Sequence, residues 1–269
     1  MPILLPILIM LGVGIVCAVL LTVAATFFAT NEDERAVKIR EVLPGANCGA
    51  CGYAGCDGYA KALSQGDVPT NLCIPGGDCT AAEIAEILGV EAADVIEKVS
   101  YVGCNGTCDA IAKKYDYDGL KTCRMAKMEY AGDRMCNYAC LGYGDCVRSC
   151  PTGAISVATG IAKVDPTKCI GCSICTRECP NNLFKLVAET TRVVVECANH
   201  DKGAATRKAC KNGCIACGKC EKTCPHDAIH VVDNLATIDY SKCTGCAACV
   251  EVCPTHCIHE VNFICGSHF

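Results

Sequence analysis

The chain has 269 residues and no tryptophan, and its other large aromatic residues are nine tyrosines and five phenylalanines. Large aromatic side chains normally supply much of the apolar area that a core buries, so another interaction must hold much of this protein together. Cysteine is the candidate for that role, because its 29 residues exceed the level that marks a chain organised by sulfur chemistry.

Two kinds of sulfur chemistry are compatible with so many cysteines. Disulfide frameworks occur in small secreted proteins in oxidising compartments. Metal centres need thiolates, and the neighbouring thiolates of C-x-x-C motifs converge on one ion or cluster. The cysteines here are grouped in such motifs, which favours metal binding in a reducing compartment over a disulfide framework.

The N-terminal stretch lacks charge, since residues 2–31 contain no Asp, Glu, Lys or Arg. As a helix it is long enough to cross a hydrocarbon core of about 30 Å. A cleaved signal peptide would carry Lys or Arg before the apolar run, and the absence of both favours a retained anchor. Because Arg35, Lys38 and Arg40 follow the span, the positive-inside rule predicts that the remainder of the chain is cytoplasmic.

Signals of catalysis and of nucleic-acid binding are also missing. The formal net charge of −5 argues against a nucleic-acid partner. The sequence has no G-x-G-x-x-G fingerprint after a strand, no Walker A motif, no C-x-x-C-H haem site, no HExxH and no serine nucleophile elbow. We therefore expect no catalytic residue and no bond-making chemistry in this chain.

An internal repeat occupies the cysteine-rich C-terminal part of the sequence. The segments CVRSCPTGAI, CTRECPNNLF, CEKTCPHDAI and CVEVCPTHCI begin at Cys146, Cys175, Cys220 and Cys249. The last three are preceded by complete C-x2-C-x2-C runs, CIGCSIC, CIACGKC and CTGCAAC. The opening segment is preceded by Cys136 and Cys140 at wider gaps, which we interpret as a working site with an enlarged loop.

This repeat is typical of [4Fe–4S] binding. A C-x2-C-x2-C loop supplies three thiolates from one tight turn, and in two-cluster ferredoxins the Cys before Pro ligates the other cluster. Zinc ribbons need neither the third loop cysteine nor the Cys-Pro. Four runs therefore predict two paired units with four clusters. The predicted ligand sets are Cys136, Cys140 and Cys146 with Cys179; Cys169, Cys172 and Cys175 with Cys150; Cys214, Cys217 and Cys220 with Cys253; and Cys243, Cys246 and Cys249 with Cys224.

A different cysteine spacing, C-x2-C-x4-C-x16-C, appears earlier in the chain. Its glycines suggest a backbone folded closely around a cluster, although zinc sites tolerate many spacings. The pattern predicts a fifth cluster on Cys48, Cys51, Cys56 and Cys73.

The combination of these features resembles the B subunit of the Rnf complex, a membrane-bound, ion-pumping ferredoxin:NAD+ oxidoreductase. The resemblance rests on VLPGANCGACGYAGC with its later cysteine, on the single apolar helix and on CLGYGDCVRSCP, and it covers nearly the whole chain. It implies that the chain receives electrons from reduced ferredoxin and relays them toward flavin- and iron-carrying membrane partners. NAD chemistry and ion translocation would belong to those other subunits.

Nine cysteines remain outside the five predicted sets. Four of them could hold a sixth [4Fe–4S] cluster near the boundary between the paired units: Cys104, Cys123, Cys197 and Cys210. The alternative is four packed thiols, because free cysteine is often simply buried. The other five are expected to be packed or unpaired: Cys17, Cys79, Cys108, Cys257 and Cys265.

Two stretches carry local positive charge, namely Lys113, Lys114, Lys121, Arg124 and Lys127, and then Lys202, Arg207, Lys208 and Lys211. They could steer the docking of an acidic ferredoxin. They could equally be ordinary solvated surface charge.

We expect a single N-terminal transmembrane helix followed by α+β iron–sulfur domains, arranged as tandem ferredoxin-like units with much irregular structure. The expected division is an anchor over 1–31, an N-terminal [4Fe–4S] domain over 32–78, a helical linker with extra cysteines over 79–130, a first dicluster unit over 131–190, a connector with extra cysteines over 191–212 and a second dicluster unit over 213–269. Within the linker, Thr80 and Glu83 form a predicted capping box and Gly89 a predicted break between two short helices.

Two other functions compete with that of an electron-relay subunit. An iron–sulfur subunit of another respiratory dehydrogenase or reductase would copurify with a molybdenum subunit and would not respond to reduced ferredoxin. A structural membrane scaffold organised by zinc would be colourless and would contain zinc.

Overall fold

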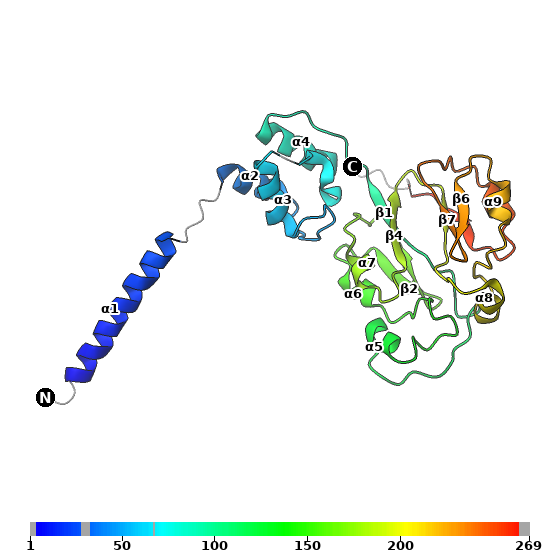
Figure 1. Ribbon diagram of the computed structural model, residues 1–269, viewed down its shortest axis with the longest axis horizontal. Coiled ribbons are helices and arrows are strands. Elements are labelled where there is room, and N and C mark those ends of the chain that lie inside the picture. The colour runs from blue at the N-terminus through cyan, green and yellow to red at the C-terminus, as the bar shows by residue number, and fades with distance from the viewer. Residues whose placement is uncertain (1–3, 28–32, 67, 264–269) are drawn as a thin grey trace.

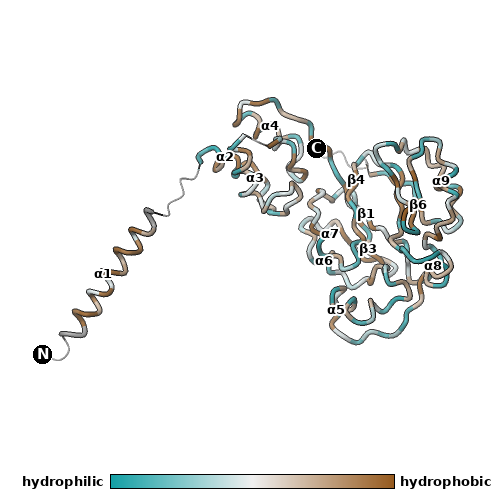
Figure 2. The backbone as a smooth tube through the Cα atoms, in the orientation of Figure 1, coloured by the Kyte–Doolittle hydropathy of each residue, from teal (hydrophilic) through white to brown (hydrophobic). Residues whose placement is uncertain are grey.

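The apolar N-terminal stretch forms one helix, α1 (Leu4–Phe27), without a charged side chain. The computed structural model of the chain describes residues 4–27, 33–66 and 68–263. The 24 residues of α1 give it a length of about 36 Å, enough to cross the hydrocarbon core of a bilayer. Its side chains are exposed from Ile7 to Val23, and Figure 2 shows this helix as a largely hydrophobic rod. Helix α1 is therefore a candidate membrane span.

A small helical domain follows. Its elements are α2 (Glu34–Val42), α3 (Gly55–Ser64), η1 (Thr70–Leu72), η2 (Ile74–Gly76) and α4 (Gly77–Leu88). Asp33 caps α2 by accepting a hydrogen bond from the Arg35 amide at 3.0 Å. Ile39, Leu63 and Ile84, one from each helix, are fully buried against one another. The three helices therefore share an apolar core of their own.

The region between residues 77 and 102 departs from its predicted form. Helix α4 begins at Gly77 and its N-cap makes no side-chain hydrogen bond, so Thr80 lies inside the helix and the predicted capping box is wrong. Gly89 ends the helix at φ +70°, as a glycine terminator does. The predicted second helix is also wrong, because residues 98–102 form the strand β1 (Lys98–Val102), most of it buried. Pairing with a distant strand overrides the local helical pattern here.

Two similar units complete the molecule, and each is built on two antiparallel two-stranded sheets. In the first unit, β1 pairs with β4 (Phe184–Ala188) so that Val102 lies opposite Phe184. A hairpin of β2 (Ile155–Ala158) and β3 (Ile161–Val164) makes the second sheet. The helices of this unit are α5 (Cys123–Met128), α6 (Asp145–Ser149) and α7 (Ile174–Glu178).

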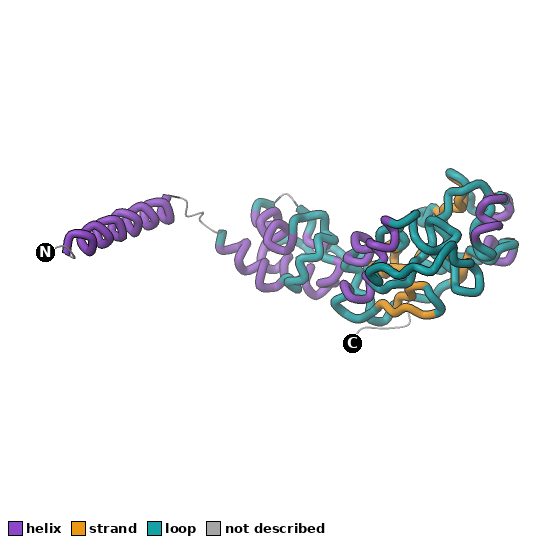
Figure 3. Tube along the Cα trace, turned by 90° about the horizontal axis from the view of Figure 1, so that it is seen from below, coloured by secondary structure: helices purple, strands orange, loops and turns teal. Residues whose placement is uncertain are grey.

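The second unit repeats this plan. Its strands are β5 (Val193–Val195) paired with β8 (Ile258–Glu260), and β6 (Ile229–Val232) paired with β7 (Leu235–Ile238). Its helices are α8 (Gly203–Ala209), α9 (Lys219–Thr223) and α10 (Ala248–Glu251). Figure 1 shows the two units side by side, and Figure 3 shows that loops make up much of both.

Each unit draws one strand from a segment that the sequence assigns to a connection. Strand β1 lies within the expected linker 79–130, and β5 lies within the expected connector 191–212. Both strands pair with the last strand of their unit, so each unit begins well before its first cysteine run.

The buried cores of the two units contain an unusual share of cysteine. In the first unit, cysteines lie among Val102, Ile155 and Leu183, and in the second among Ile229 and Ile258. No large aromatic side chain fills the centre of the second core. The cysteine-lined sites therefore take the place that packed aromatic side chains have in other small domains.

Candidate iron–sulfur sites

The structure brings 24 cysteines together in six groups of four. Among the described residues, no three His, Cys, Asp or Glu side chains converge closely enough to hold a single metal ion. In four of the groups the four thiols instead line a common cavity.

Site 1 belongs to the small helical domain and contains Cys48, Cys51, Cys56 and Cys73. Asn47 Oδ1 accepts a hydrogen bond from the Cys56 amide at 2.9 Å. Gly55 has φ +84°, and a Cβ there would lie 3.0 Å from Asn47 Oδ1, so the loop needs glycine at this position. Tyr59 lies below the loop, where its hydroxyl donates to the Pro69 carbonyl at 2.8 Å and accepts from the Leu72 amide at 3.3 Å. These contacts hold the loop before Cys73 against α3.

Site 2 lies in the first unit and contains Cys150, Cys169, Cys172 and Cys175. Gly171 has φ +65°, and a Cβ there would lie 2.5 Å from the Lys98 carbonyl oxygen, so only glycine allows the loop to pack on β1. Ser100 Oγ lies 3.5 Å from Cys175 Sγ. Burial raises the pKa of the Cys175 thiol to about 11.

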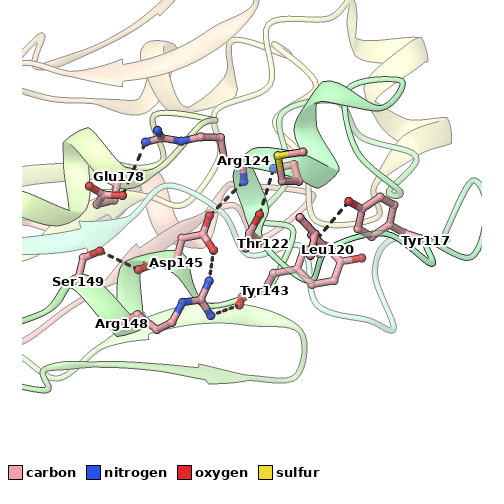
Figure 4. Close-up of polar contacts among 10 residues, drawn as sticks. Tyr117, Leu120, Thr122, Arg124, Tyr143, Asp145, Arg148, Ser149 and Glu178 are labelled. Atoms are coloured by element: carbon pink, nitrogen blue, oxygen red, sulfur yellow. Dashed lines mark hydrogen bonds and ion pairs between the residues drawn. The ribbon is translucent and has the colours of Figure 1, made fainter.

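Site 3, also in the first unit, contains Cys123, Cys140, Cys146 and Cys179. Cys123 is the first residue of α5, and Thr122 Oγ1 caps this helix by accepting from the Met125 amide at 3.2 Å. The Arg124 amide donates to Asp145 Oδ2 at 3.1 Å, and the Arg124 guanidinium lies 3.8 Å from Glu178 Oε2. Figure 4 shows these contacts, which attach α5 to α6, where Cys146 lies, and to α7, which Cys179 follows.

Site 4 lies between the two units and contains Cys104, Cys136, Cys197 and Cys210. Cys104 follows β1 and Cys197 follows β5, so each unit contributes the residue just beyond its first strand. The Cys210 segment is held across the boundary, because the Lys211 amide donates to the Ala110 carbonyl at 3.0 Å. Nearby, Asn212 Nδ2 donates to the Asn105 carbonyl at 2.9 Å.

These positions differ from the predicted sets at two cysteines. The sequence places Cys136 with Cys140, Cys146 and Cys179, and Cys123 with the three extra thiols. In the structure the two are exchanged, so that Cys123 lines the cavity of site 3 and Cys136 that of site 4. The spacing of cysteines along the chain did not carry this information, because Cys123 reaches site 3 only through the packing of α5.

Site 5 in the second unit contains Cys214, Cys217, Cys220 and Cys253. Cys257, which was expected to be packed or unpaired, is fully buried beside this site with its sulfur 3.6 Å from Cys253 Sγ. A hydrogen bond from the Cys257 thiol lowers the pKa of Cys253 to about 4. Cys257 therefore acts as a neighbour that favours the Cys253 thiolate.

Site 6 is at the other end of the second unit and contains Cys224, Cys243, Cys246 and Cys249. Its cavity is closed by apolar side chains of the sheets, Val193, Ile229 and Ile238. Gly245, in the tight turn of the loop, has φ +74°.

Adjacent sites are linked by hydrogen bonds or by shared helices, so that the six form a connected series. Arg177, on α7 of the first unit, donates a hydrogen bond to the Cys48 carbonyl and so joins site 1 to site 2. Sites 2 and 3 share α6 and α7. The Cys140 amide donates to Cys104 Sγ at 3.3 Å, joining sites 3 and 4. The Cys214 amide donates to Cys197 Sγ, also at 3.3 Å, joining sites 4 and 5. Sites 5 and 6 share α9 and α10.

The thiols of these sites have the environment that an iron–sulfur cluster needs. Burial raises the pKa of Cys104 to about 12 and that of Cys197 to about 11, so a bare thiolate is disfavoured at both. A bound cation reverses this preference. Backbone amides donate to the Cys104 and Cys197 sulfurs, as stated above, and such bonds stabilise the thiolate form. In site 4 all four thiols are buried around one cavity, an arrangement that fits a [4Fe–4S] cluster.

The remaining thiols lie elsewhere. Cys17 on α1, Cys79 on α4 and Cys108 are exposed. Cys265 lies outside the described residues.

Family models match the same regions. A family described as "Putative Fe-S cluster" matches residues 43–75, which contain site 1. The description "4Fe-4S dicluster domain" applies to two models, which match residues 168–228 and 208–260.

Curated relatives cover most of the chain. The B subunit of the Na(+)-translocating ferredoxin:NAD(+) oxidoreductase complex of Acetobacterium woodii is 44% identical over 86% of this chain and 70% of its own length. The proton-translocating counterpart of Clostridium ljungdahlii is 42% identical over 85% and 81%. The B subunit of the ion-translocating oxidoreductase complex of Methanosarcina acetivorans is 38% identical over 86% and 88%. The chain, with its [4Fe–4S] domains, therefore belongs to the B-subunit family of the ion-translocating ferredoxin:NAD+ oxidoreductase (Rnf) complexes.

Proposed function

We propose that this chain is a membrane-anchored electron relay that accepts electrons from reduced ferredoxin and passes them through six [4Fe–4S] clusters to other subunits of an Rnf complex. The observation that carries this proposal is the series of six cysteine sites, in which neighbouring sites are linked by hydrogen bonds or by shared helices. A [4Fe–4S] cluster supplies one-electron redox chemistry, and the protein tunes it through burial and hydrogen bonds to sulfur.

The residues of the chain have three tasks in this proposal. The 24 cysteines of sites 1 to 6 provide ligands. Apolar side chains such as Leu183 and Ile229 exclude water from the sites. Residues between sites keep neighbours at fixed separation, as Arg177 does for sites 1 and 2. NAD reduction and ion translocation are assigned to partner subunits, because α1 has no charged side chain with which to bind an ion.

The membrane arrangement in this proposal has a single span. Helix α1 crosses the membrane, and Arg35, Lys38 and Arg40 remain on the cytoplasmic side with the iron–sulfur domains. Such a placement keeps the thiols in a reducing compartment and exposes them to a soluble donor.

The donor is proposed to dock on the surface around α5, called here the α5 surface. Its exposed apolar side chains are Leu120, Met125, Met128, Tyr130 and Met135, which are between 41% and 81% exposed. Lys113, Lys121 and Arg124 are exposed beside them. Residues 113–130 contain five basic and three acidic side chains, so the segment is net basic, and an apolar surface with this charge suits an acidic ferredoxin. Cys123 of site 3 is buried beneath it.

The first experiment is a determination of iron, acid-labile sulfide and zinc on protein purified without oxygen. About 24 iron atoms with matching sulfide would support six clusters, and about 20 would leave one group as packed thiols. Zinc without sulfide would overturn the proposal in favour of a structural scaffold.

The donor surface has a separate test. Met128→Glu on the α5 surface should weaken ferredoxin binding and raise the KM for ferredoxin, because it adds a negative charge to a 77%-exposed apolar site. The matched control is Val232→Glu on β6 of the second unit, where the side chain is 58% exposed. Equal effects of the two variants would contradict docking at this surface.

A further inference from the structure

We infer that Cys123 is a ligand of site 3 and that Cys136 is a ligand of site 4. At site 3, Cys123 takes the role that the middle cysteine of the C-x2-C-x2-C run has at sites 2, 5 and 6. This inference rests on the proposed function, because it requires that both sites hold [4Fe–4S] clusters. It changes the meaning of the opening cysteine run, whose two wide gaps would no longer belong to one binding loop.

The two units establish which residues are equivalent. Five residues separate Cys140 from Cys146, and five separate Cys214 from Cys220. Cys140 and Cys214 also have the same surroundings, because each donates its amide proton at 3.3 Å to the sulfur of the cysteine that follows the first strand of its unit. Counting from these positions, Tyr143 stands where the second unit has its middle cysteine, Cys217. The first unit therefore lacks one ligand within its loop.

Tyr143 has another function at that position. Its hydroxyl donates to Asp133 Oδ2 at 3.0 Å, and its ring meets that of Tyr117 edge to face with centroids 5.7 Å apart. Cys123 is buried in the same small apolar cluster as these two rings, and it also lines the cavity of site 3. A thiol from α5 thus reaches the site next to the place where the loop has a tyrosine.

Cys136 belongs to site 4 by its contacts. Asn199 Nδ2 donates to Cys136 Sγ at 3.3 Å, and Asn199 is a fully buried residue of the second unit. The Cys136 thiol lines the cavity between the units, while the cavity of site 3 is lined without it. Two ligands of site 4, Cys104 and Cys136, then precede the first repeat segment, and the other two, Cys197 and Cys210, lie in the connector 191–212.

A crossed rescue experiment tests both assignments on the full-length chain. Cys123→Ala should leave a three-iron cluster or none at site 3, a loss of between about one and four iron atoms per chain. Adding Tyr143→Cys to Cys123→Ala should restore the iron and sulfide of the wild type and remove any three-iron EPR signal. Adding Tyr143→Cys to Cys136→Ala should restore nothing, because the new thiol lies at the wrong site.

The reverse pattern, in which Tyr143→Cys rescues Cys136→Ala but not Cys123→Ala, would overturn the inference and reinstate the grouping predicted from spacing. Unchanged iron in Cys123→Ala would also overturn it, and would make Cys123 a packed thiol. Rescue requires a folded chain, so a misfolded single variant cannot imitate the expected result. A wild-type chain without iron would contradict the proposed function itself, which separates that failure from a wrong ligand assignment.

Discussion

The first and second units share a backbone plan but differ in where their thiols come from. In the second unit, all three loop cysteines of site 5 lie within seven consecutive residues, Cys214 to Cys220. In the first unit, site 3 has Tyr143 at the middle position and a thiol from α5, twenty residues earlier. The comparison shows that the chain can supply the thiols of equivalent sites from different elements.

The difference extends to the surface. The segment that delivers Cys123 also carries the exposed side chains of the α5 surface, for which the second unit has no equivalent insertion before its loop. A site whose loop already supplies three thiols, as at site 5, needs no such segment. The α5 segment therefore distinguishes the first unit from the second, and we propose that it makes the first unit the one that docks ferredoxin.

The largest expected effect comes from removing the site that connects the units. Cys197→Ala should lose up to about four iron atoms and interrupt electron transfer between the first and second units. The measurement is iron content together with the rate of NAD+ reduction by reduced ferredoxin in the assembled complex. Cys79→Ala, which removes an exposed thiol of α4, is the control and should change neither quantity. Normal turnover with site 4 empty would place that site off the electron path.

The next effect concerns the attachment of α5, which only the first unit has. Asp145→Ala removes the acceptor of the Arg124 amide bond, a loss of about 1 kcal/mol. Site 3 should then release iron to a chelator faster than in the wild type. The equivalent residue of the second unit is Lys219, and Lys219→Ala should release iron at the wild-type rate. Equal release from both variants would contradict a role of α5 in retaining the cluster.

A smaller effect concerns site 4, where the segment after Cys197 differs from the segment after Cys104. Asn199, two residues after Cys197, donates to Cys136 Sγ, whereas Gly106 stands two residues after Cys104. Asn199→Leu should make the potential of one cluster more negative by on the order of 40 mV, the equivalent of a lost hydrogen bond of about 1 kcal/mol. The sign follows because the donor stabilises the more negative, reduced state. Redox titration followed by EPR would detect the shift, and a shift to more positive potential would contradict it.

The smallest effect comes from making the two units more alike. Cys257 of the second unit occupies the place of Leu183 in the first. Each lies four residues after the second Cys-Pro cysteine of its unit, Cys253 and Cys179 respectively. Cys257→Leu adds volume at a fully buried position, so it should cost about 1–3 kcal/mol in the free energy of unfolding, but its effect on the clusters should be the smallest, with the iron content unchanged. Thermal unfolding and iron analysis test this, and a loss of iron would show that Cys257 is a ligand.

Much of this arrangement could be predicted from residue order, since the four Cys-Pro segments and the three complete runs are local patterns. Strand β1 could not, because residues 98–102 continue a helical pattern and become a strand only by pairing with β4. The exchange of Cys123 and Cys136 escaped prediction for a similar reason. The spacing of Cys136 from Cys140 imitates a stretched binding run, and nothing in the sequence indicates that α5 packs against α6.

The sequence by itself determined that this protein is organised by clustered thiols, that residues 2–31 form an apolar stretch and that its cysteine-rich part is a repeat. It could do so because ligand spacing, hydropathy and Cys-Pro motifs are properties of neighbouring residues. Only the tertiary structure decided which thiols share a cavity and in what order the sites follow one another. Those relations depend on contacts between residues far apart in the chain, such as Arg177 with Cys48 and Asn199 with Cys136, which form when the domains pack.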